Sequence, residues 1–360
     1  LIDEQENLVY SFYGKNHGEP LKVIQKALLE FKQKCDDLNI KLNILGSGTT
    51  GYGERLFYEA FRVDYHTVET VAHAEAALKY APEASFILDV GGQDMKAIFL
   101  NRGIVTGITL NEACSAGCGS FLENFAGSLK IPVDQIAEKA FLSKAPSTLG
   151  SRCTVFMNSS VITEQKNGKL PEDIMAGLCN SVIENVFTKV IRLSNLKMLG
   201  DNIVVQGGTF RNDAVLRALE LYTNRRVVRA PYPGEMGAIG IALLTKKHQQ
   251  ELGRRETGLI SWQEISDFSY SQETGLMCPY CSNNCNRTRI SFSSGTSIIT
   301  GNRCERGEIL GEASDPTVKK KLQQLSSRRD NSRDLFRYRQ KLIFKDYNPK
   351  QLSPPKDVTI

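Results

Sequence analysis

A glycine-acidic turn that interrupts an apolar run constrains this chain more than any other feature. Residues 86–90 predict a buried strand, and the sequence Asp-Val-Gly-Gly-Gln-Asp over residues 89–94 ends it. Because glycine has no Cβ, the amides of Gly91 and Gly92 can approach phosphate oxygens, while Asp89 can orient a magnesium ion or a water molecule. Taken alone, such a turn is more often a tight hairpin than a phosphate site, so it needs support from other segments.

Two later segments also combine glycine with the start of a helix. Gly207-Gly208-Thr209 lies between a short apolar strand and a helix expected from Asn212, where a ribose, base or phosphate can rest against a helix N-terminus. A plain strand-to-helix turn is the alternative. The segment 234–240 places small residues along one helix face, which suits close packing at least as well as ligand contact. In this order, the three weak signals together indicate a nucleotide site.

Strands and helices alternate through the first two thirds of the sequence. Strands are expected at residues 8–13, 40–45, 86–90, 95–100, 104–108, 203–206 and 226–229. Helices are expected at residues 20–38, 54–61, 67–80, 121–129, 133–141, 161–165, 174–196, 212–222 and 236–244. This order predicts an α/β fold in which helices cover sheets.

The length of 360 residues exceeds what one core usually organises, so two or more domains are expected. We expect an ATPase-type domain over residues 1–248 and a polar connector over 249–275. A small cysteine-rich unit over 276–312 follows, and then a basic helix and linker over 313–360.

Charge and hydropathy argue against two classes of partner. The net charge of +5 is small beside 45 basic and 40 acidic residues, and much of the excess lies in residues 319–345, as on a solvated helix face. Nucleic acid is therefore not expected as a partner. No apolar run approaches a membrane span and the first residues do not resemble a signal peptide, so we expect a cytoplasmic protein without membrane contact.

Nine cysteines in a reducing compartment indicate metal ligands rather than disulfides. Four form a late cluster whose spacing suits either a zinc site or an iron-sulfur cluster: Cys278, Cys281, Cys285 and Cys304. The sequence does not decide between the two. Cys35 and Cys179 stand alone on helical patterns and are interpreted as small buried hydrophobic residues.

The remaining cysteines lie in two distinctive motifs, residues 111–123 (Asn-Glu-Ala-Cys-Ser-Ala-Gly-Cys-Gly-Ser-Phe-Leu-Glu) and 153–156 (Cys-Thr-Val-Phe). With Gly-Tyr-Gly-Glu-Arg at 51–55 and the turn at 89–96, they resemble the activators of 2-hydroxyacyl-CoA dehydratases and the ATPase subunits of benzoyl-CoA reductases. That family belongs to the acetate-kinase, sugar-kinase, Hsp70 and actin superfamily. The resemblance covers roughly residues 5–246 and implies a two-lobed fold that closes over ATP and magnesium.

The resemblance implies an oxygen-sensitive homodimer that passes an electron from a low-potential donor to an acyl-CoA dehydratase or reductase. Cys114 and Cys153 match the positions that ligate one [4Fe-4S] cluster between subunits. The stoichiometry agrees, because such a cluster needs four thiolates and each chain offers two in this region. Without the resemblance, Cys114 would be interpreted as a packing residue at a tight turn.

The sequence departs from the family pattern in two respects. Cys118 occupies a position where the family usually has a small residue without a thiol. The first phosphate hairpin, rich in glycine, is missing, and Leu1-Ile-Asp3 reads as the strand beyond it. We therefore expect an excerpt, the second activase module of a large protein with two modules, that pairs with a second copy or within its parent and binds ATP poorly alone.

The predicted site thus has three groups of residues. Catalytic roles at the phosphates are expected for Asp89, Gln93 and Asp94. Nucleotide contacts are expected from Gly91, Gly92, Gly207, Gly208, Thr209, Asn212, Glu235 and Gly237. Two other functions stay open: a cluster-free kinase of the same superfamily, for which no catalytic acid is evident, and a non-catalytic scaffold stabilised by metal.

Overall fold

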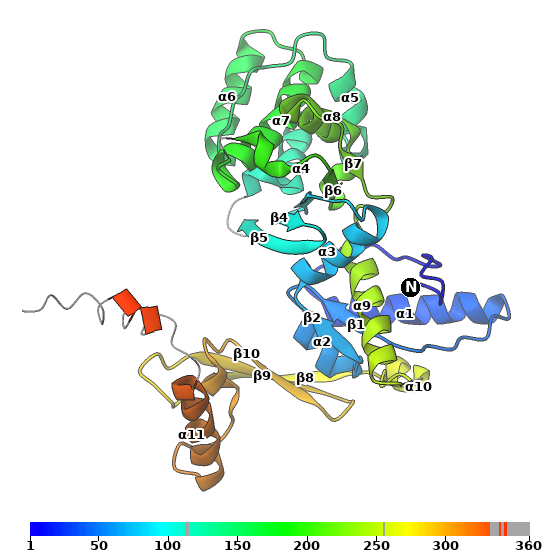
Figure 1. The fold of residues 1–360 in the computed structure, drawn as a ribbon, viewed down its shortest axis with the longest axis vertical. Helices are drawn as coiled ribbons and strands as arrows, with labels where there is room; N and C mark the ends of the chain where they lie inside the picture. The colour runs from blue at the N-terminus through cyan, green and yellow to red at the C-terminus, as the bar shows by residue number, and fades with distance from the viewer. Residues whose placement is uncertain (112–114, 194, 255, 332–337, 340–341, 344–360) are drawn as a thin grey trace, which may run out of the picture. The chain divides into compact units, whose positions relative to one another are not determined.

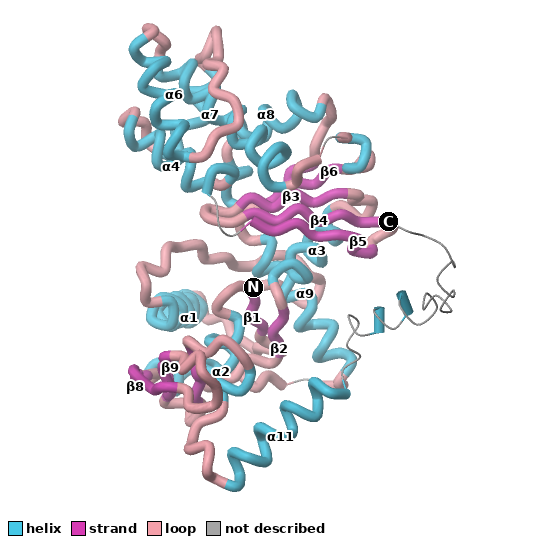
Figure 2. Tube along the Cα trace, turned by 90° about the vertical axis from the view of Figure 1, so that its left-hand side faces the viewer, coloured by secondary structure: helices cyan, strands magenta, loops and turns pink. Residues whose placement is uncertain are grey.

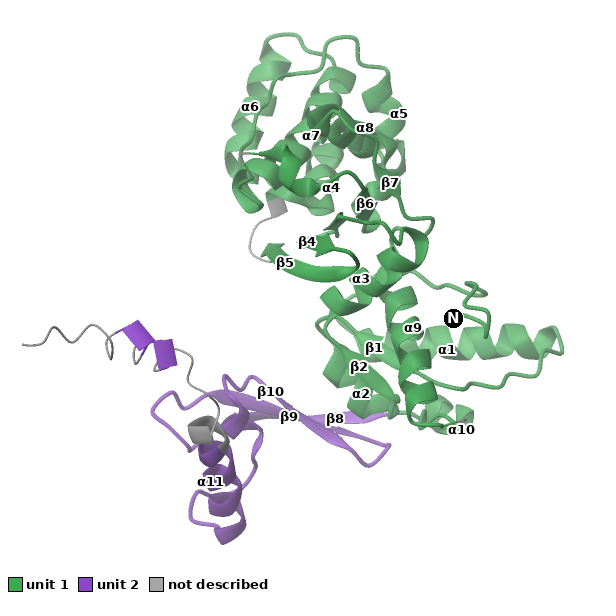
Figure 3. Cartoon of the chain, in the orientation of Figure 1, with its two compact units in different colours: residues 1–268 green, residues 269–360 purple. Residues whose placement is uncertain are grey.

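The computed structural model describes residues 1–111, 115–193, 195–254, 256–331, 338–339 and 342–343. The chain divides after Phe268 into two compact units, residues 1–268 and 269–360 (Figure 3). The division falls within the expected connector, residues 249–275. Those residues include a short helix, α10 (Trp262–Ser266), whose Ile265 carbonyl accepts a hydrogen bond from Gln25 Nε2 at 2.8 Å. The stretch before Phe268 is therefore part of the first unit rather than a free linker.

A five-stranded mixed sheet lies at the centre of the first unit (Figures 1 and 2). Its strands are β3 (Phe86–Val90), β4 (Met95–Asn101), β5 (Ile104–Asn111), β6 (Ile203–Gln206) and β7 (Val228–Arg229). The order is β5-β4-β3-β6-β7, with β3, β4 and β5 antiparallel and with β6 and β7 parallel to β3. The structure confirms the five strands predicted for this sheet and the hairpin between β4 and β5, although β7 is shorter than expected.

Helices surround this sheet and a second, two-stranded parallel sheet of β1 (Gly48–Thr50) and β2 (Tyr65–Thr67). They are α1 (Pro20–Asp37), α2 (Glu54–Phe61), α3 (Glu69–Tyr80), α4 (Gly119–Ser128), α5 (Ile136–Phe141), α6 (Thr154–Lys166), α7 (Pro171–Asn185), α8 (Asp213–Thr223) and α9 (Met236–Glu251). The helix expected over 174–196 ends earlier, because a π-helical turn, Val186–Val190, follows α7. The helix expected over 161–165 is longer and begins at Thr154.

Two predicted strands are wrong. Residues 40–45 have no regular structure, and within residues 8–13 only Leu8 forms a bridge, to Ile2. Apolar side chains in both segments are exposed, including Val9 at 62% and Ile40 at 51%. An apolar run becomes a strand only where a neighbouring strand can take up its backbone hydrogen bonds, and neither segment has one among the described residues.

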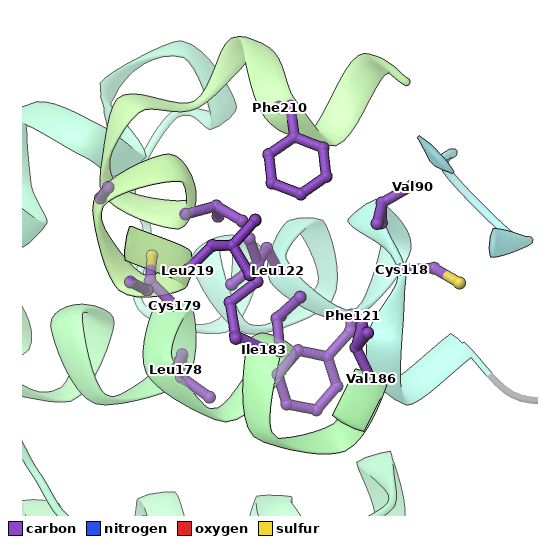
Figure 4. Close-up of a cluster of buried hydrophobic side chains, with 14 of the residues drawn as sticks. Val90, Cys118, Phe121, Leu122, Leu178, Cys179, Ile183, Val186, Phe210 and Leu219 are labelled. Atoms are coloured by element: carbon purple, nitrogen blue, oxygen red, sulfur yellow. The ribbon is translucent and has the colours of Figure 1, made fainter. Parts of the chain in front are cut away.

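Strand β3 is buried on both faces and separates two cores. Alternate residues of it, Phe86, Leu88 and Val90, belong to the larger core together with side chains of α4, α7 and α8. Val90 is labelled in Figure 4. Ile87 faces the other way and packs against Ala74 and Ala77 of α3. Because side chains alternate along a strand, Asp89 also points toward α3.

Helix α3 lies against both the sheet and α9, and glycine permits the second contact. A Cβ at Gly240 of α9 would be 1.7 Å from the Ala72 carbonyl oxygen, and one at Gly237 would be 3.0 Å from His73 Nε2. The small-residue face of residues 234–240 therefore serves close helix packing. A role of Gly237 in ligand contact stays a prediction.

We expect Gly240→Ala to destabilise the first unit by about 3 kcal/mol, because an added methyl group forces α9 away from α3. The matched control is Gly127→Ala in α4, where a Cβ would meet nothing within 4 Å. That change should be neutral or stabilise by up to about 1 kcal/mol, since alanine favours helix. Urea unfolding of both variants measures the difference, and equal stabilities would contradict the packing argument.

The second unit contains an antiparallel sheet and a helix. The sheet order is β10-β9-β8, with β8 (Tyr270–Met277), β9 (Asn286–Phe292) and β10 (Ser297–Thr300), and the helix is α11 (Pro316–Asn331). Throughout the described part of the chain, no helix has both the length and the apolar composition that a membrane span requires.

Candidate nucleotide site

Three polar side chains form a row across neighbouring strands of the large sheet. Asp89 of β3 is in register with Lys96 of β4 on one side and with Gln206 of β6 on the other. All three are at most 4% exposed and, by strand alternation, lie on the face that α3 covers. The sequence thus places a carboxylate, an ammonium and an amide side by side in an otherwise apolar layer.

Helix α3 supplies the partners of this row. Glu69 and His73 are four residues apart, so they lie on one face of the helix. His73 Nδ1 is 2.7 Å from Asp89 Oδ2, and Lys96 Nζ is 2.5 Å from Glu69 Oε1. Gln206 Nε2 donates a second hydrogen bond to Asp89 Oδ2, at 3.1 Å. The result is a buried network in which every charge has an opposite neighbour.

The network sets the ionisation of its members. Burial alone would raise the pKa of Asp89 and lower that of His73, because both charged forms lose hydration. The attraction between the two reverses both effects, so the pKa of Asp89 is lowered and that of His73 is raised. Burial likewise opposes the charge of Lys96, but hydrogen bonds to Asp94 and Glu69 raise its pKa. Asp89 is therefore held as a carboxylate.

The turn after β3 is closed by its own residues. Gly91 N–H donates to the Asp94 carbonyl oxygen at 2.9 Å, and Asp94 Oδ2 is 2.6 Å from Lys96 Nζ. A Cβ at Gly91 would lie 2.5 Å from Asp94 Oδ1, so a larger residue there would displace the Asp94 carboxylate. Gly92 and Gln93 are exposed, and a Cβ at Gly92 would meet nothing within 4 Å. The Asp94 carboxylate thus braces the turn, and Gly92 with Gln93 forms its open side.

The second glycine pair lies directly against this turn. Gly207 has φ +91°, and a Cβ there would be 2.3 Å from the Val90 carbonyl oxygen. Thr209 Oγ1 donates to the Gly91 carbonyl oxygen at 2.9 Å. The structure therefore brings together the motifs at 89–94 and 207–209, which are more than a hundred residues apart in the sequence.

Helix α4 completes the turn. The amides of Gly119 and Ser120 donate to the carbonyl oxygens of Gly91 and Gly92, at 2.9 and 2.8 Å. Ser120 Oγ and Gln206 Oε1 are buried and have no hydrogen-bond partner among the described residues. Buried polar atoms in native proteins are almost always paired, so each of these two atoms can take a hydrogen bond from a ligand or a water molecule.

Other predicted contact residues have structural partners of their own. Asn212 is the N-cap of α8, and its Oδ1 accepts from the amides of Ala214 and Val215. Glu235 Oε1 is 2.5 Å from Arg211 Nη2, and the Arg211 guanidinium lies 4.4 Å from the centre of the Tyr13 ring. Nucleotide contacts of Asn212, Glu235 and Gly208 stay predictions.

The two cysteines predicted as shared ligands differ in what the structure says of them. Cys114 lies outside the described residues. Cys153 is exposed at the N-cap of α6, next to Val155 at 76% and Phe156 at 67% exposure. Cys118 is fully buried in the larger core. Its thiol is therefore not accessible from outside in this structure.

Asn185 connects the two cysteine-bearing segments. It is 1% exposed, and its Nδ2 donates to the carbonyl oxygens of Ala116 at 2.9 Å and Arg152 at 3.1 Å. Its Oδ1 accepts from Ser151 Oγ at 2.8 Å. One buried amide thus holds the segment that follows Cys114 beside the residue that precedes Cys153.

Sequence reasoning missed four residues of this site: Glu69, His73, Lys96 and Asn185. A signal existed for the first two, because they are polar and spaced by four residues on a helix rich in alanine. Lys96 also interrupts an apolar strand on the side that Asp89 faces. Asn185 gave no signal, since its partners are distant in the sequence.

The four late cysteines behave differently from the expectation of a closed metal unit. Cys278 is buried, Cys281 is exposed, and Cys285 and Cys304 are partly buried. Among the described residues, no three His, Cys, Asp or Glu side chains are grouped so as to hold a metal ion.

The two isolated cysteines meet their prediction, because Cys35 and Cys179 are both buried. Burial raises the pKa of Cys179 to about 12, which makes its thiol unreactive.

The large sheet is mixed and has the order β5-β4-β3-β6-β7, and the glycine turns after β3 and β6 meet at one site. This arrangement is that of an α/β ATPase related to actin and Hsp70. Comparison with known proteins identifies the family within this fold. The chain belongs to the BadF/BadG/BcrA/BcrD ATPase family, whose model matches residues 10–245.

Relatives with assigned activities include dehydratase activators and part of a reductase. The (R)-2-hydroxyglutaryl-CoA dehydratase activating ATPase of Acidaminococcus fermentans is 32% identical over 234 residues, which cover 65% of this chain and 85% of the relative. A benzoyl-CoA reductase subunit of Thauera aromatica is 30% identical over 247 residues, covering 66% and 83%. The structure of the activator of 2-hydroxyisocaproyl-CoA dehydratase from Clostridium difficile, with bound ADPNP, matches with a TM-score of 0.59 at 27% identity over 70% of this chain and 91% of that one.

The ion pair of Asp89 and His73 predicts a pH dependence of stability. The raised pKa of His73 stabilises the fold fully below its ordinary value of 6.5, and this contribution is lost as pH rises through the folded-state value. Because the pKa of Asp89 is lowered in the folded state, its carboxylate stabilises the fold above pH 3.8. This stabilisation is lost as pH falls through the folded-state pKa. The pair therefore stabilises most between these two ordinary values.

We expect wild-type protein to lose more stability than His73→Gln on going from about pH 6 to about pH 9, by ~1.4 kcal/mol for each unit by which the histidine pKa is raised. Urea unfolding at both pH values measures this difference. The matched control, His17→Gln, changes an exposed loop histidine and should keep the wild-type dependence. A stability difference between wild type and His73→Gln that stays constant with pH would contradict the ion pair.

Proposed function

We propose that this chain is an ATP-dependent activator that transfers an electron through a [4Fe-4S] cluster to an acyl-CoA dehydratase or benzoyl-CoA reductase type of partner. The named activities of the relatives support this proposal. Cys114 and Cys153 would hold the cluster together with the same residues of a second copy or module. When bound, a cluster of this kind accepts and donates single electrons at low potential.

The observation that carries the proposal is the direct contact between α4 and the turn after β3. Two amides at the start of α4, from Gly119 and Ser120, hydrogen-bond to the carbonyl oxygens of Gly91 and Gly92. If the backbone of this turn moves between the ATP-bound and ADP-bound states, the movement would act on the segment that leads from Cys114 into α4. ATP can drive an uphill reduction only if the two nucleotide states differ in this way.

The surroundings of Cys153 support a ligand shared between chains. Cys153 is the N-cap residue of α6 and its side chain is exposed. The exposed Val155 and Phe156 beside it offer apolar surface of the kind that association buries. Two thiolates per chain do not complete a four-iron cluster, so a second copy or module is required.

The chain's own residues account for the nucleotide side. Asp89, kept ionised by His73 and Lys96, would orient a magnesium ion or the attacking water. Gln93, on the open side of the turn, would contact the terminal phosphate, while Asp94 fixes the turn through Lys96. Gly207 and Gly208 would lie against the adenosine.

We expect each of the variants Cys114→Ala and Cys153→Ala to lose the iron bound by Cys114 and Cys153, which is about four iron atoms for every two chains. Anaerobic purification followed by iron and sulfide analysis measures this loss. Cys35→Ala is the control, because Cys35 is a buried cysteine of α1 and should keep the iron.

Other results of the same preparation would contradict the electron carrier. Release of ADP that depends on a sugar, from protein without iron, would indicate a kinase. Colourless protein that does not respond to nucleotide would indicate a scaffold. Iron retained in both cysteine variants would exclude Cys114 and Cys153 as its ligands.

Asn185→Asp tests the bridge between the cysteine segments. A carboxylate cannot donate to the carbonyl oxygens of Ala116 and Arg152, so we expect a loss of about 1–3 kcal/mol in stability and faster loss of iron. The control is the same change at Asn224, an exposed residue that ends α8. Equal rates of iron loss in the two variants would contradict the bridging role.

A further inference from the structure

Three of the four late cysteines lie in one loop, at an end of the sheet of the second unit. Met277 and Asn286 are paired at the end of the β8–β9 ladder, and Cys278 and Cys285 are the next residues outward. The amide of Cys278 donates to the carbonyl oxygen of Cys285 at 2.9 Å. This bond closes the loop 278–285, which also contains Cys281.

The fourth cysteine follows β10 at the same end of the sheet. Gly301 has φ +80°, and a Cβ there would be 2.5 Å from the Asn286 carbonyl oxygen, so the chain passes directly beside the residue after Cys285. Cys304 then begins a turn in which its carbonyl oxygen accepts from the Gly307 amide at 2.9 Å. Two cysteine-bearing turns therefore meet at one place.

Side chains fasten these turns together. Arg287 Nη1 donates to the carbonyl oxygens of Gly307 at 2.9 Å and Ile309 at 2.8 Å, and its Nη2 donates to that of Met277 at 3.2 Å. Tyr280, from within the loop 278–285, donates to the carbonyl oxygen of Gly311 at 2.9 Å. The backbone around all four cysteines is thus held in place by contacts that do not involve the thiols.

Arg287 is a buried cation beside the cysteine-bearing turns, and its guanidinium lies 5.8 Å from the centre of the Tyr280 ring. It is 3% exposed, all four of its hydrogen bonds end on neutral carbonyl oxygens, and no carboxylate of the described residues pairs with it. A buried charge is costly unless it has a counter-charge. Four thiolates around a divalent cation carry a net charge of minus two and would supply it.

The second unit buries few apolar side chains for its size. In its described part, the buried ones are Cys278, Ile290, Phe292, Ile298 and Val318. Small hydrophobic cores of this kind are commonly supplemented by disulfides or a structural metal. The four described cysteines of this unit form no disulfides, so a bound metal ion is the remaining way for them to cross-link it.

We propose that Cys278, Cys281, Cys285 and Cys304 bind one Zn²⁺ ion that stabilises the second unit. The spacing is compatible with zinc, because Cys278 and Cys281 form a Cys-x₂-Cys pair and 18 residues separate Cys285 from Cys304, although it does not by itself distinguish zinc from an iron-sulfur cluster. The thiols are not grouped around a common point in this structure, so binding requires these side chains to turn toward one another. The proposal does not depend on the ATP-driven activity.

The test uses the full chain, purified under reducing and anaerobic conditions, with zinc, iron and sulfide measured per chain. We expect one zinc ion in the wild type and at least a tenfold lower occupancy in Cys281→Ser and Cys304→Ser. Cys281 is exposed, so its substitution disturbs no packing. Cys35→Ala and Cys153→Ala should both keep the zinc, which separates this site from the proposed cluster.

A second readout reports the structural role. Removing zinc with a chelator should make residues 269–331 at least tenfold more sensitive to limited proteolysis and leave residues 1–268 protected, and adding zinc should restore resistance. Replacement by Co²⁺ should give the visible absorption of a tetrahedral thiolate complex. Zinc-free protein whose four cysteines react as free thiols would overturn the proposal, and so would iron and sulfide that are lost in Cys281→Ser.

Discussion

The site depends on keeping a charged carboxylate inside a sheet. Asp89 is in the central strand, flanked by β4 and β6, where an unpaired carboxylate would take up a proton. His73 and Lys96 prevent this, and His73 can reach Asp89 only because α3 lies directly on the sheet. The contact of α3 with α9 at Gly240 then fixes that helix from its other side. One ion pair thereby relates the packing of both helices to the ionisation of a candidate catalytic group.

The turn after β3 is the point where this layer meets the rest of the site. Its carbonyl oxygens accept from Thr209 on one side and from the start of α4 on the other. The contacts with α4 join backbone atoms on both sides, so a shift of Gly91 and Gly92 cannot be absorbed there by side chains. Under the proposed function, this arrangement is how hydrolysis in one place would alter the surroundings of a cysteine in another.

Local chemistry determined what the sequence could predict. The strand 86–90, the hairpin after it and the helix from Asn212 all follow from alternation, glycine and capping, which act over a few residues. The segment 40–45 has the composition of a strand, but whether it forms one depends on a partner strand that local sequence does not reveal. Asn185 is beyond such reasoning as well, because its acceptors lie 69 and 33 positions away.

Cys118 and Cys153 show how burial distinguishes residues whose local settings match. Both are N-cap residues with extended backbone, at α4 and α6, so both thiols lie at the positive end of a helix dipole. The side chain of Cys118 is enclosed by the larger core, whereas Cys153 is exposed beside exposed apolar residues. Under the proposed function, a ligand shared with another chain must be reachable from outside, which Cys153 is and Cys118 is not.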